Sequence, residues 1–172
     1  MSKFKKIIFA IFFITIVYFS LQQLGFIGGL EQVKAIDDKY SVGEGKLIPA
    51  TSEELEQYER ELRNLNVSGD TKDVVAVKLE LIEMQKSLLE YQANISQIDF
   101  EALNCSVSGP IAKARNAGEK AIQHAELALQ KSKSLSKNIS GFGYFIKSDF
   151  EEGIKAVKDA LSGPINTLKT IC

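Results

Sequence analysis

A heptad repeat through residues 74–98 limits the fold more than any other pattern in the sequence. Its apolar positions step by 3 and 4 residues without an error, the spacing of one face of an α-helix: Val74, Val77, Leu81, Met84, Leu88, Tyr91, Ile95 and Ile98. Val75, Ile82 and Leu89 widen this stripe on one side. A helix with so wide an apolar stripe contacts more than one neighbour, so we expect it inside a bundle rather than in a two-stranded coiled coil.

Two further helices are predicted on either side of this repeat. The first begins near Ser52, after a capping box at Thr51 to Glu54, and ends before Asn66. The other opens at Pro110, a favourable first helical position, and runs to about Asn138. The apolar seam of this later helix consists largely of alanine and glycine. Small side chains let two helix backbones approach closely, so this helix should pack tightly against the bulky 74–98 helix.

A last helix begins at the capping box Ser148 to Glu151 and continues to about Leu168. The Gly163-Pro164 pair should bend or interrupt it, because proline lacks a backbone donor and its ring meets the carbonyl four residues earlier. Proline is scarce elsewhere and tryptophan is absent, a composition that favours helix over sheet. The sequence therefore predicts an all-α fold, an up-down-up-down four-helix bundle over residues 51–172.

The first 30 residues are typical of a signal anchor or signal peptide. Lys3, Lys5 and Lys6 precede an apolar run from residue 7, and no further charge appears before Glu31. The uncharged stretch 7–30 is long enough to cross a membrane as a helix, although its strongest apolar part is short enough for a cleaved signal. We expect an uncleaved anchor, with a secreted protein as the alternative, and in either case a C-terminal domain outside the cytoplasm.

The mixed composition of residues 31–50, with charges, two glycines and Pro49, predicts a flexible tether between anchor and bundle. Beyond it the chain holds two cysteines, Cys105 and Cys172. An even cysteine count in an exported chain predicts a disulfide, whereas two buried free thiols are the alternative. In the predicted topology both cysteines lie at the same end of the bundle, and their bond would join the last helix to the loop after the 74–98 helix.

Four asparagines stand in N-x-Ser sequons, which exceeds the number expected by chance: Asn66, Asn94, Asn104 and Asn138. In an exported chain they are possible glycosylation sites, while asparagine as a helix-stop residue explains two of them without a glycan.

The loop 140–147 holds Phe142, Tyr144 and Phe145 between glycines. These side chains either fold down and cap the open end of the bundle or form an exposed contact for a partner. Replacing Phe142 and Tyr144 by serine separates the two hypotheses, since it destabilises the fold only in the first case.

No pattern of a nucleotide, metal or nucleophile site occurs in the sequence, so we expect no enzymatic activity, cofactor or metal. His124 is the only histidine and has no ligand-type spacing around it, so it is expected to be a partly exposed helix residue. The charges nearly balance, at a net −1, so nucleic acid is not an expected partner.

These features favour a membrane-anchored extracytoplasmic bundle with a structural or protein-interaction role in an envelope or surface assembly. The alternative is a secreted or tethered bundle that binds a small ligand, with an apolar pocket where Gly163-Pro164 opens the core.

Overall fold

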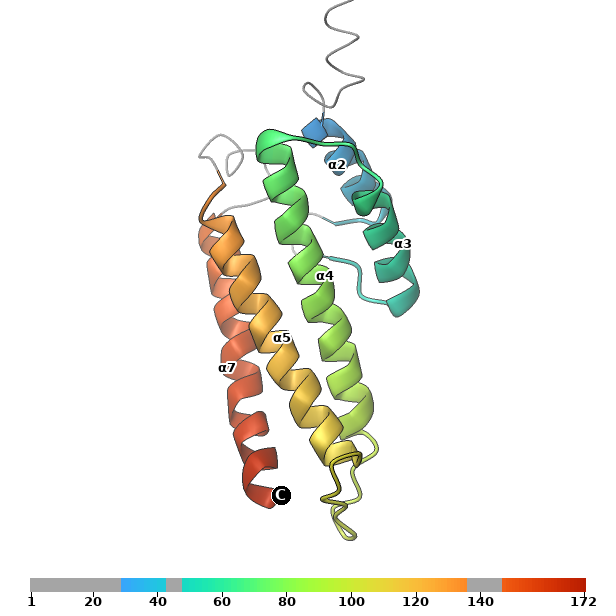
Figure 1. The fold of residues 1–172 in the computed structure, drawn as a ribbon, viewed down its shortest axis with the longest axis vertical. Coiled ribbons are helices and arrows are strands. Elements are labelled where there is room, and N and C mark those ends of the chain that lie inside the picture. Colours follow the sequence, from blue (N-terminus) through green and yellow to red (C-terminus); the bar gives the residue numbers. More distant parts are fainter. Residues whose placement is uncertain (1–28, 43–47, 136–146) are drawn as a thin grey trace, which may run out of the picture.

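A computed structural model of the chain describes residues 29–42, 48–135 and 147–172. All regular structure in these ranges is helical, which confirms the predicted all-α class (Figure 1). The helices are α2 (Gly29–Lys39), α3 (Ser52–Arg63), α4 (Gly69–Ile95), α5 (Pro110–Ser132) and α7 (Lys147–Ile171). Most of the predicted anchor, residues 1–28, lies outside the described residues. Within the described residues, every helix is too short or too polar to span a membrane.

The four predicted helices alternate in direction along the long axis of the molecule, and α5 lies between α4 and α7 (Figure 1). α3 has 12 residues and α4 has 27, so α3 covers only part of its neighbour. α2 packs on both α3 and α4. The molecule thus has more helices at the end where α4 begins, which we call the α2 end. At the opposite end, the disulfide end, the described helices are α4, α5 and α7.

Helix α2 corrects the expectation of a flexible tether over residues 31–50. Val33, Ile36 and Tyr40 follow a spacing of 3 and 4 residues, and all three are buried in the main core. Lys34, Asp38 and Lys39 occupy the solvent side of the same turns, whereas Asp37 is buried with the apolar face. The described remainder of the segment also contributes to the core, since Val42 and Ile48 are buried.

The contact between α4 and α5 is the most extensive in the fold, as the small-residue seam predicted. Ala114, Ala121, Ala125 and Ala128 have no exposed surface. At Gly118 the helices come close together, because a Cβ atom there would lie 2.8 Å from Ile165 Cδ1 of α7 and 3.2 Å from Tyr91 Cδ2 of α4. The small side chains of α5 therefore let it pack closely against both neighbours.

Gly163-Pro164 was expected to bend or interrupt the last helix, but α7 continues through Pro164, so the interruption is absent. Pro164 lies on the exposed side of the helix. Water can hydrate the carbonyl that loses its helical hydrogen bond there, which lowers the cost of the missing donor. The next residue, Ile165, is buried against α5, and this packing holds the helix together across the proline.

Candidate functional site

The predicted cysteine pair closes the disulfide end. The sulfur atoms of Cys105 and Cys172 lie 2.01 Å apart and their Cα atoms 5.4 Å apart. Cys105 belongs to residues 96–109 between α4 and α5, which we call the disulfide loop, and Cys172 follows α7 directly. The bond therefore ties this loop to the end of the last helix.

Local hydrogen bonds give the disulfide loop a defined shape. Asp99 Oδ1 accepts hydrogen bonds from the backbone N–H groups of Glu101, at 2.9 Å, and Ala102, at 3.3 Å. Asn104 Oδ1 accepts one from the N–H of Ser106 at 3.0 Å. At Gly109 the backbone comes so close that an added Cβ would lie 2.7 Å from the carbonyl oxygen of Asn104. Only glycine fits this turn without a shift of the backbone.

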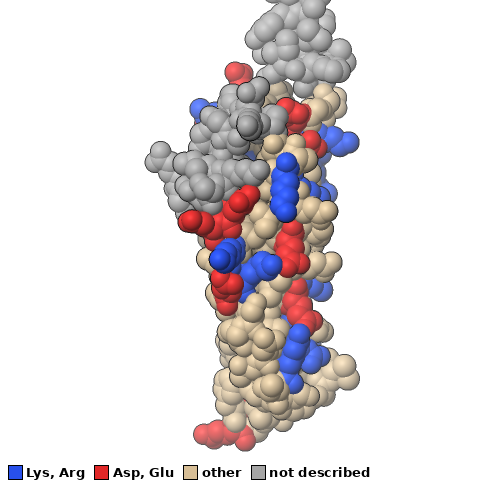
Figure 2. Space-filling model, turned by 90° about the vertical axis from the view of Figure 1, so that its left-hand side faces the viewer, with Lys and Arg blue, Asp and Glu red and all other residues tan. Residues whose placement is uncertain are grey.

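The same loop carries an exposed apolar surface, which we call the apolar tip. It consists of Phe100, Leu103 and Val107, with exposed fractions of 66%, 47% and 92%. These are the exposed large apolar side chains of the described residues. In Figure 2 most of the surface at the lower end of the molecule is uncharged. The charged side chains at the very bottom of this view are acidic. The loop's charged residues are Asp99 and Glu101, on either side of Phe100, and it contains no lysine or arginine.

The other sequence-predicted positions have different outcomes. Asn66 and Asn104 are exposed, so glycosylation there stays a prediction. Asn94 is buried, and its Nδ2 atom donates a hydrogen bond of 2.7 Å to the carbonyl oxygen of Glu90. Since Nδ2 is the atom that a glycan would occupy, this position does not suit modification of the folded chain. Asn138, Phe142, Tyr144 and Phe145 lie outside the described residues.

A buried polar cluster at the α2 end was missed by the sequence analysis. Lys78 Nζ lies 2.8 Å from Asp37 Oδ2, and Tyr58 OH donates to Asp37 Oδ1 at 2.5 Å. Asp37 and Tyr58 have no exposed surface and Lys78 has 3%. Burial lowers the pKa of Lys78, opposed by the charge of Asp37, while burial and then Asp37 raise the pKa of Tyr58. Because solvent does not reach the three groups, the cluster joins α2 to α3 and α4 rather than offering a reactive group.

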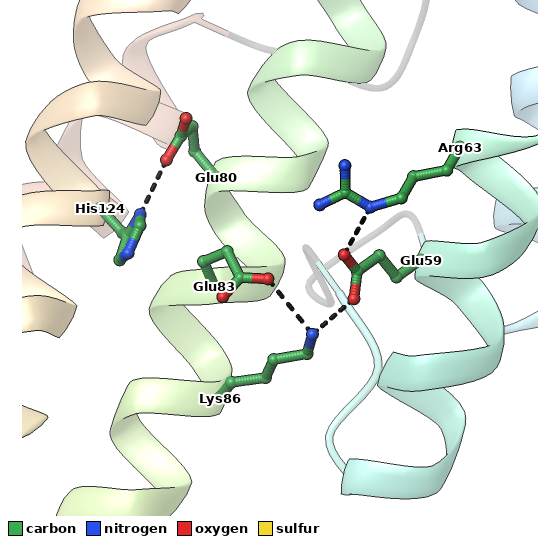
Figure 3. A network of polar contacts seen from close by, with 6 residues as sticks. All are labelled: Glu59, Arg63, Glu80, Glu83, Lys86 and His124. Carbon is green, nitrogen blue, oxygen red and sulfur yellow. Dashed lines mark hydrogen bonds and ion pairs between the residues drawn. The ribbon is translucent and has the colours of Figure 1, made fainter.

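Two groups of polar contacts lie nearer the surface, one between α4 and α5 and the other between α3 and α4 (Figure 3). Glu80 accepts from Lys131 at 2.5 Å and pairs with His124 Nδ1 at 2.8 Å. Glu59 accepts from Arg63 at 2.6 Å and from Lys86. Among the described residues, no three His, Cys, Asp or Glu side chains are grouped as metal ligands would be. His124 is a partly exposed helix residue, as predicted, and its Nδ1 atom contacts Glu80 Oε2.

A groove of about 480 Å³ lies between α5 and α7. Leu129 and the buried Ile154 line its apolar part, and charged side chains border it: Lys133, Glu151, Lys155, Lys158 and Asp159. The alternative hypothesis placed an apolar pocket where Gly163-Pro164 opens the core, but α7 continues there and Leu161 and Ile165 pack into the core.

Comparison with protein-family models, with curated proteins and with solved structures finds no match to this chain.

Proposed function

We propose that the chain is a membrane-anchored extracytoplasmic helical protein with a structural or protein-interaction role in an envelope or surface assembly. Its contact surface in this proposal is the apolar tip. The observation that carries the proposal is the exposure of three large apolar side chains on an ordered, cross-linked loop. Covering such side chains with a partner is favourable, because it removes apolar surface from water without first ordering the loop.

The arrangement of the two ends supports this role. The described chain begins at Gly29, which packs against Thr71 in the first turn of α4. The disulfide loop follows the other end of α4, and a helix of 27 residues is about 40 Å long. An anchor before Gly29 would therefore leave the apolar tip on the far side of the molecule from the membrane. A partner would have free access to the loop in that orientation.

Replacing the apolar tip tests the interaction role. The triple variant Phe100→Ser, Leu103→Ser, Val107→Ser should lose co-purification of the partner from native membranes. Its unfolding temperature should stay within about 2 °C of the wild type, because side chains that are already exposed contribute little to the folded state. The matched control changes the exposed Lys72 and Asp73 at the α2 end to serine and should keep the partner. Retention of every co-purifying protein by the triple variant would contradict the role of the tip.

The proposed location has its own test. Lysines of the folded domain should react with a membrane-impermeable amine reagent in intact cells, and the protein should stay with the membranes in alkaline carbonate. Labelling only after lysis would contradict an extracytoplasmic domain. Release by carbonate would instead favour the secreted form. Both readouts are independent of the partner.

Small-ligand binding is a second candidate, favoured by the groove between α5 and α7. Its volume of about 480 Å³ lies in the range of ligand sites. An apolar base whose border has three lysines, Lys133, Lys155 and Lys158, against two acids, Glu151 and Asp159, suits an anionic amphiphile. The anionic fluorescent dye 1-anilinonaphthalene-8-sulfonate should bind there and lose affinity in Lys155→Glu, while the tip triple variant binds it equally. Equal dye affinity in Lys155→Glu and the wild type would remove this candidate.

A further inference from the structure

We propose that the partner of the apolar tip is a protein with a concave apolar cleft bordered by lysine or arginine side chains. This inference rests on the proposed interaction role of the tip and specifies the chemistry of the other side. It follows from the shape of the disulfide loop, the size of its apolar surface and the sign of its charge.

The loop presents its apolar side chains from a fixed backbone. Two hydrogen bonds to Asp99 fix the turn around Phe100, and the bond from Cys105 to Cys172 holds the middle of the loop to α7. Val107, three residues before the start of α5, has 92% of its surface exposed. A projecting, preorganised loop loses little conformational freedom on binding, so its few side chains can act as anchors in a pocket.

The apolar tip is too small for a flat interface. Its three side chains expose on the order of 350 Å². A stable protein interface buries about 800 Å² on each partner. A cleft that encloses the loop from several sides adds the loop's backbone and polar flanks to the buried area, whereas two tips that meet face to face do not. Area therefore favours a concave partner over a second copy of this chain.

The negative charge of the disulfide loop determines which charge the rim of the partner's cleft should carry. Asp99 and Glu101 flank Phe100, and neither carboxylate has an ion pair with a described residue. The nearest basic residue in the sequence, Lys113, lies one turn into α5, and Lys169 of α7 is paired with Glu119 at 2.7 Å. Two acidic loops would repel each other, and an anionic lipid surface would repel the loop in the same way. Lysine or arginine side chains on the partner would form ion pairs with the carboxylates of Asp99 and Glu101.

The experiment places the photoreactive amino acid benzoyl-phenylalanine at Val107 in the full-length chain, expressed in its own cells. Three backgrounds are compared. The first is otherwise wild type. The second carries Asp99→Asn and Glu101→Lys, because asparagine keeps the oxygen that accepts the two turn hydrogen bonds while it removes the charge. The third carries Asp73→Lys, a charge reversal at the exposed start of α4, as the matched control. Circular dichroism melting of each purified variant verifies the fold.

We expect one protein crosslink that keeps its yield in Asp73→Lys and falls at least 10-fold in the loop variant. It should weaken as salt rises from 50 to 500 mM, and the crosslinked peptide of the partner should contain lysine or arginine beside apolar residues. A protein crosslink that is indifferent to the loop charge would overturn the basic rim but leave the interaction role standing. Crosslinks to lipid or to a second copy would overturn the partner class. The absence of any crosslink would overturn the interaction role itself.

Discussion

The two ends of this protein are stabilised in different ways. At the α2 end, side chains from all five described helices pack in one large core, and bulky residues such as Leu55, Leu62 and Leu81 are fully buried there. It also encloses an ion pair between Asp37 and Lys78. The disulfide end has smaller apolar clusters between α4, α5 and α7, and it is closed by a covalent bond.

The difference explains why the disulfide end can expose apolar side chains. A loop held by packing must turn its apolar residues inward, because their burial is what orders it. The disulfide loop is held by a crosslink, by hydrogen bonds to Asp99 and Asn104 and by one buried side chain, Ile98, so it keeps its shape without burying Phe100 or Val107. The exposed apolar side chains of the loop are then free to serve another purpose, although Ile98 of the same loop packs against α5 and α7.

Breaking the buried ion pair should have the largest effect on the unfolding free energy, and this effect should begin at the α2 end. Lys78→Met leaves the carboxylate of Asp37 in the core without its cation, which should cost about 3 to 5 kcal/mol of unfolding free energy. Urea denaturation of the purified domain measures this loss. Hydrogen exchange should show it first in α2, α3 and the start of α4, with the disulfide loop unchanged.

A double variant is the control for this prediction. Asp37→Leu together with Lys78→Met replaces both charges by apolar groups and should recover most of the lost stability, because no charge is left buried. If the double variant is as unstable as Lys78→Met alone, packing rather than the unpaired charge is the cause. If Lys78→Met is as stable as the wild type, the ion pair does not hold the α2 end.

Removing the disulfide should have the next largest effect. The cysteines are 67 residues apart, and Cys105→Ser with Cys172→Ser should lower the unfolding free energy by about 4 kcal/mol on the chain-entropy model. Hydrogen exchange should lose its protection locally in the disulfide loop and the last turns of α7. This pattern is the reverse of the one expected for Lys78→Met. Local loss of protection in α2 instead would show that the two ends are not stabilised separately.

The helices were accessible from the sequence because periodicity and capping residues report them locally. The heptads of α4, Thr51 before α3 and Pro110 at the start of α5 each mark a real element. Thr51 Oγ1, for example, accepts the predicted hydrogen bond from the N–H of Glu54 at 3.3 Å. Helix α2 was missed because its apolar face is only three residues long and depends on the tertiary contacts that it makes.

The candidate site was less accessible for a physical reason. The cysteine pairing followed from the number of cysteines and the predicted topology. The sequence around Phe100, Leu103 and Val107, however, does not show whether these side chains are exposed or folded against a helix end. Their exposure depends on the turn at Asp99 and on the crosslink acting together. The Asp37 and Lys78 pair was equally hidden, since both resemble ordinary solvent-facing helix residues until two segments 41 positions apart meet.

A third prediction concerns the close approach of α5 to its neighbours. In Gly118→Val the new Cβ would lie 2.8 Å from Ile165 Cδ1 and 3.2 Å from Tyr91 Cδ2. Repacking these side chains should cost about 1 to 3 kcal/mol in urea denaturation. The matched control, Asn116→Val, changes an exposed residue of the same helix and should stay within about 0.5 kcal/mol. Equal losses of unfolding free energy in the two variants would show that the contact around Gly118 can accommodate a larger side chain without repacking.

The smallest expected effect is a difference in acid sensitivity between the ends. Burial alone would raise the pKa of Glu59 and of Glu80, but hydrogen bonds from Lys86 and Arg63 to Glu59, and from Lys131 and His124 to Glu80, outweigh it and lower both. A lowered carboxyl pKa stabilises the folded state above the unfolded value of 4.5. That contribution is lost as the pH falls below 4.5 through the folded pKa. Hydrogen exchange at pH 4 against pH 6, corrected for intrinsic rates, should therefore show the contacts of α4 with α3 and with α5 loosening before the disulfide loop, whose crosslink does not titrate. Glu59→Gln with Glu80→Gln should remove this difference, and its persistence in that variant would assign the acid sensitivity to other carboxylates.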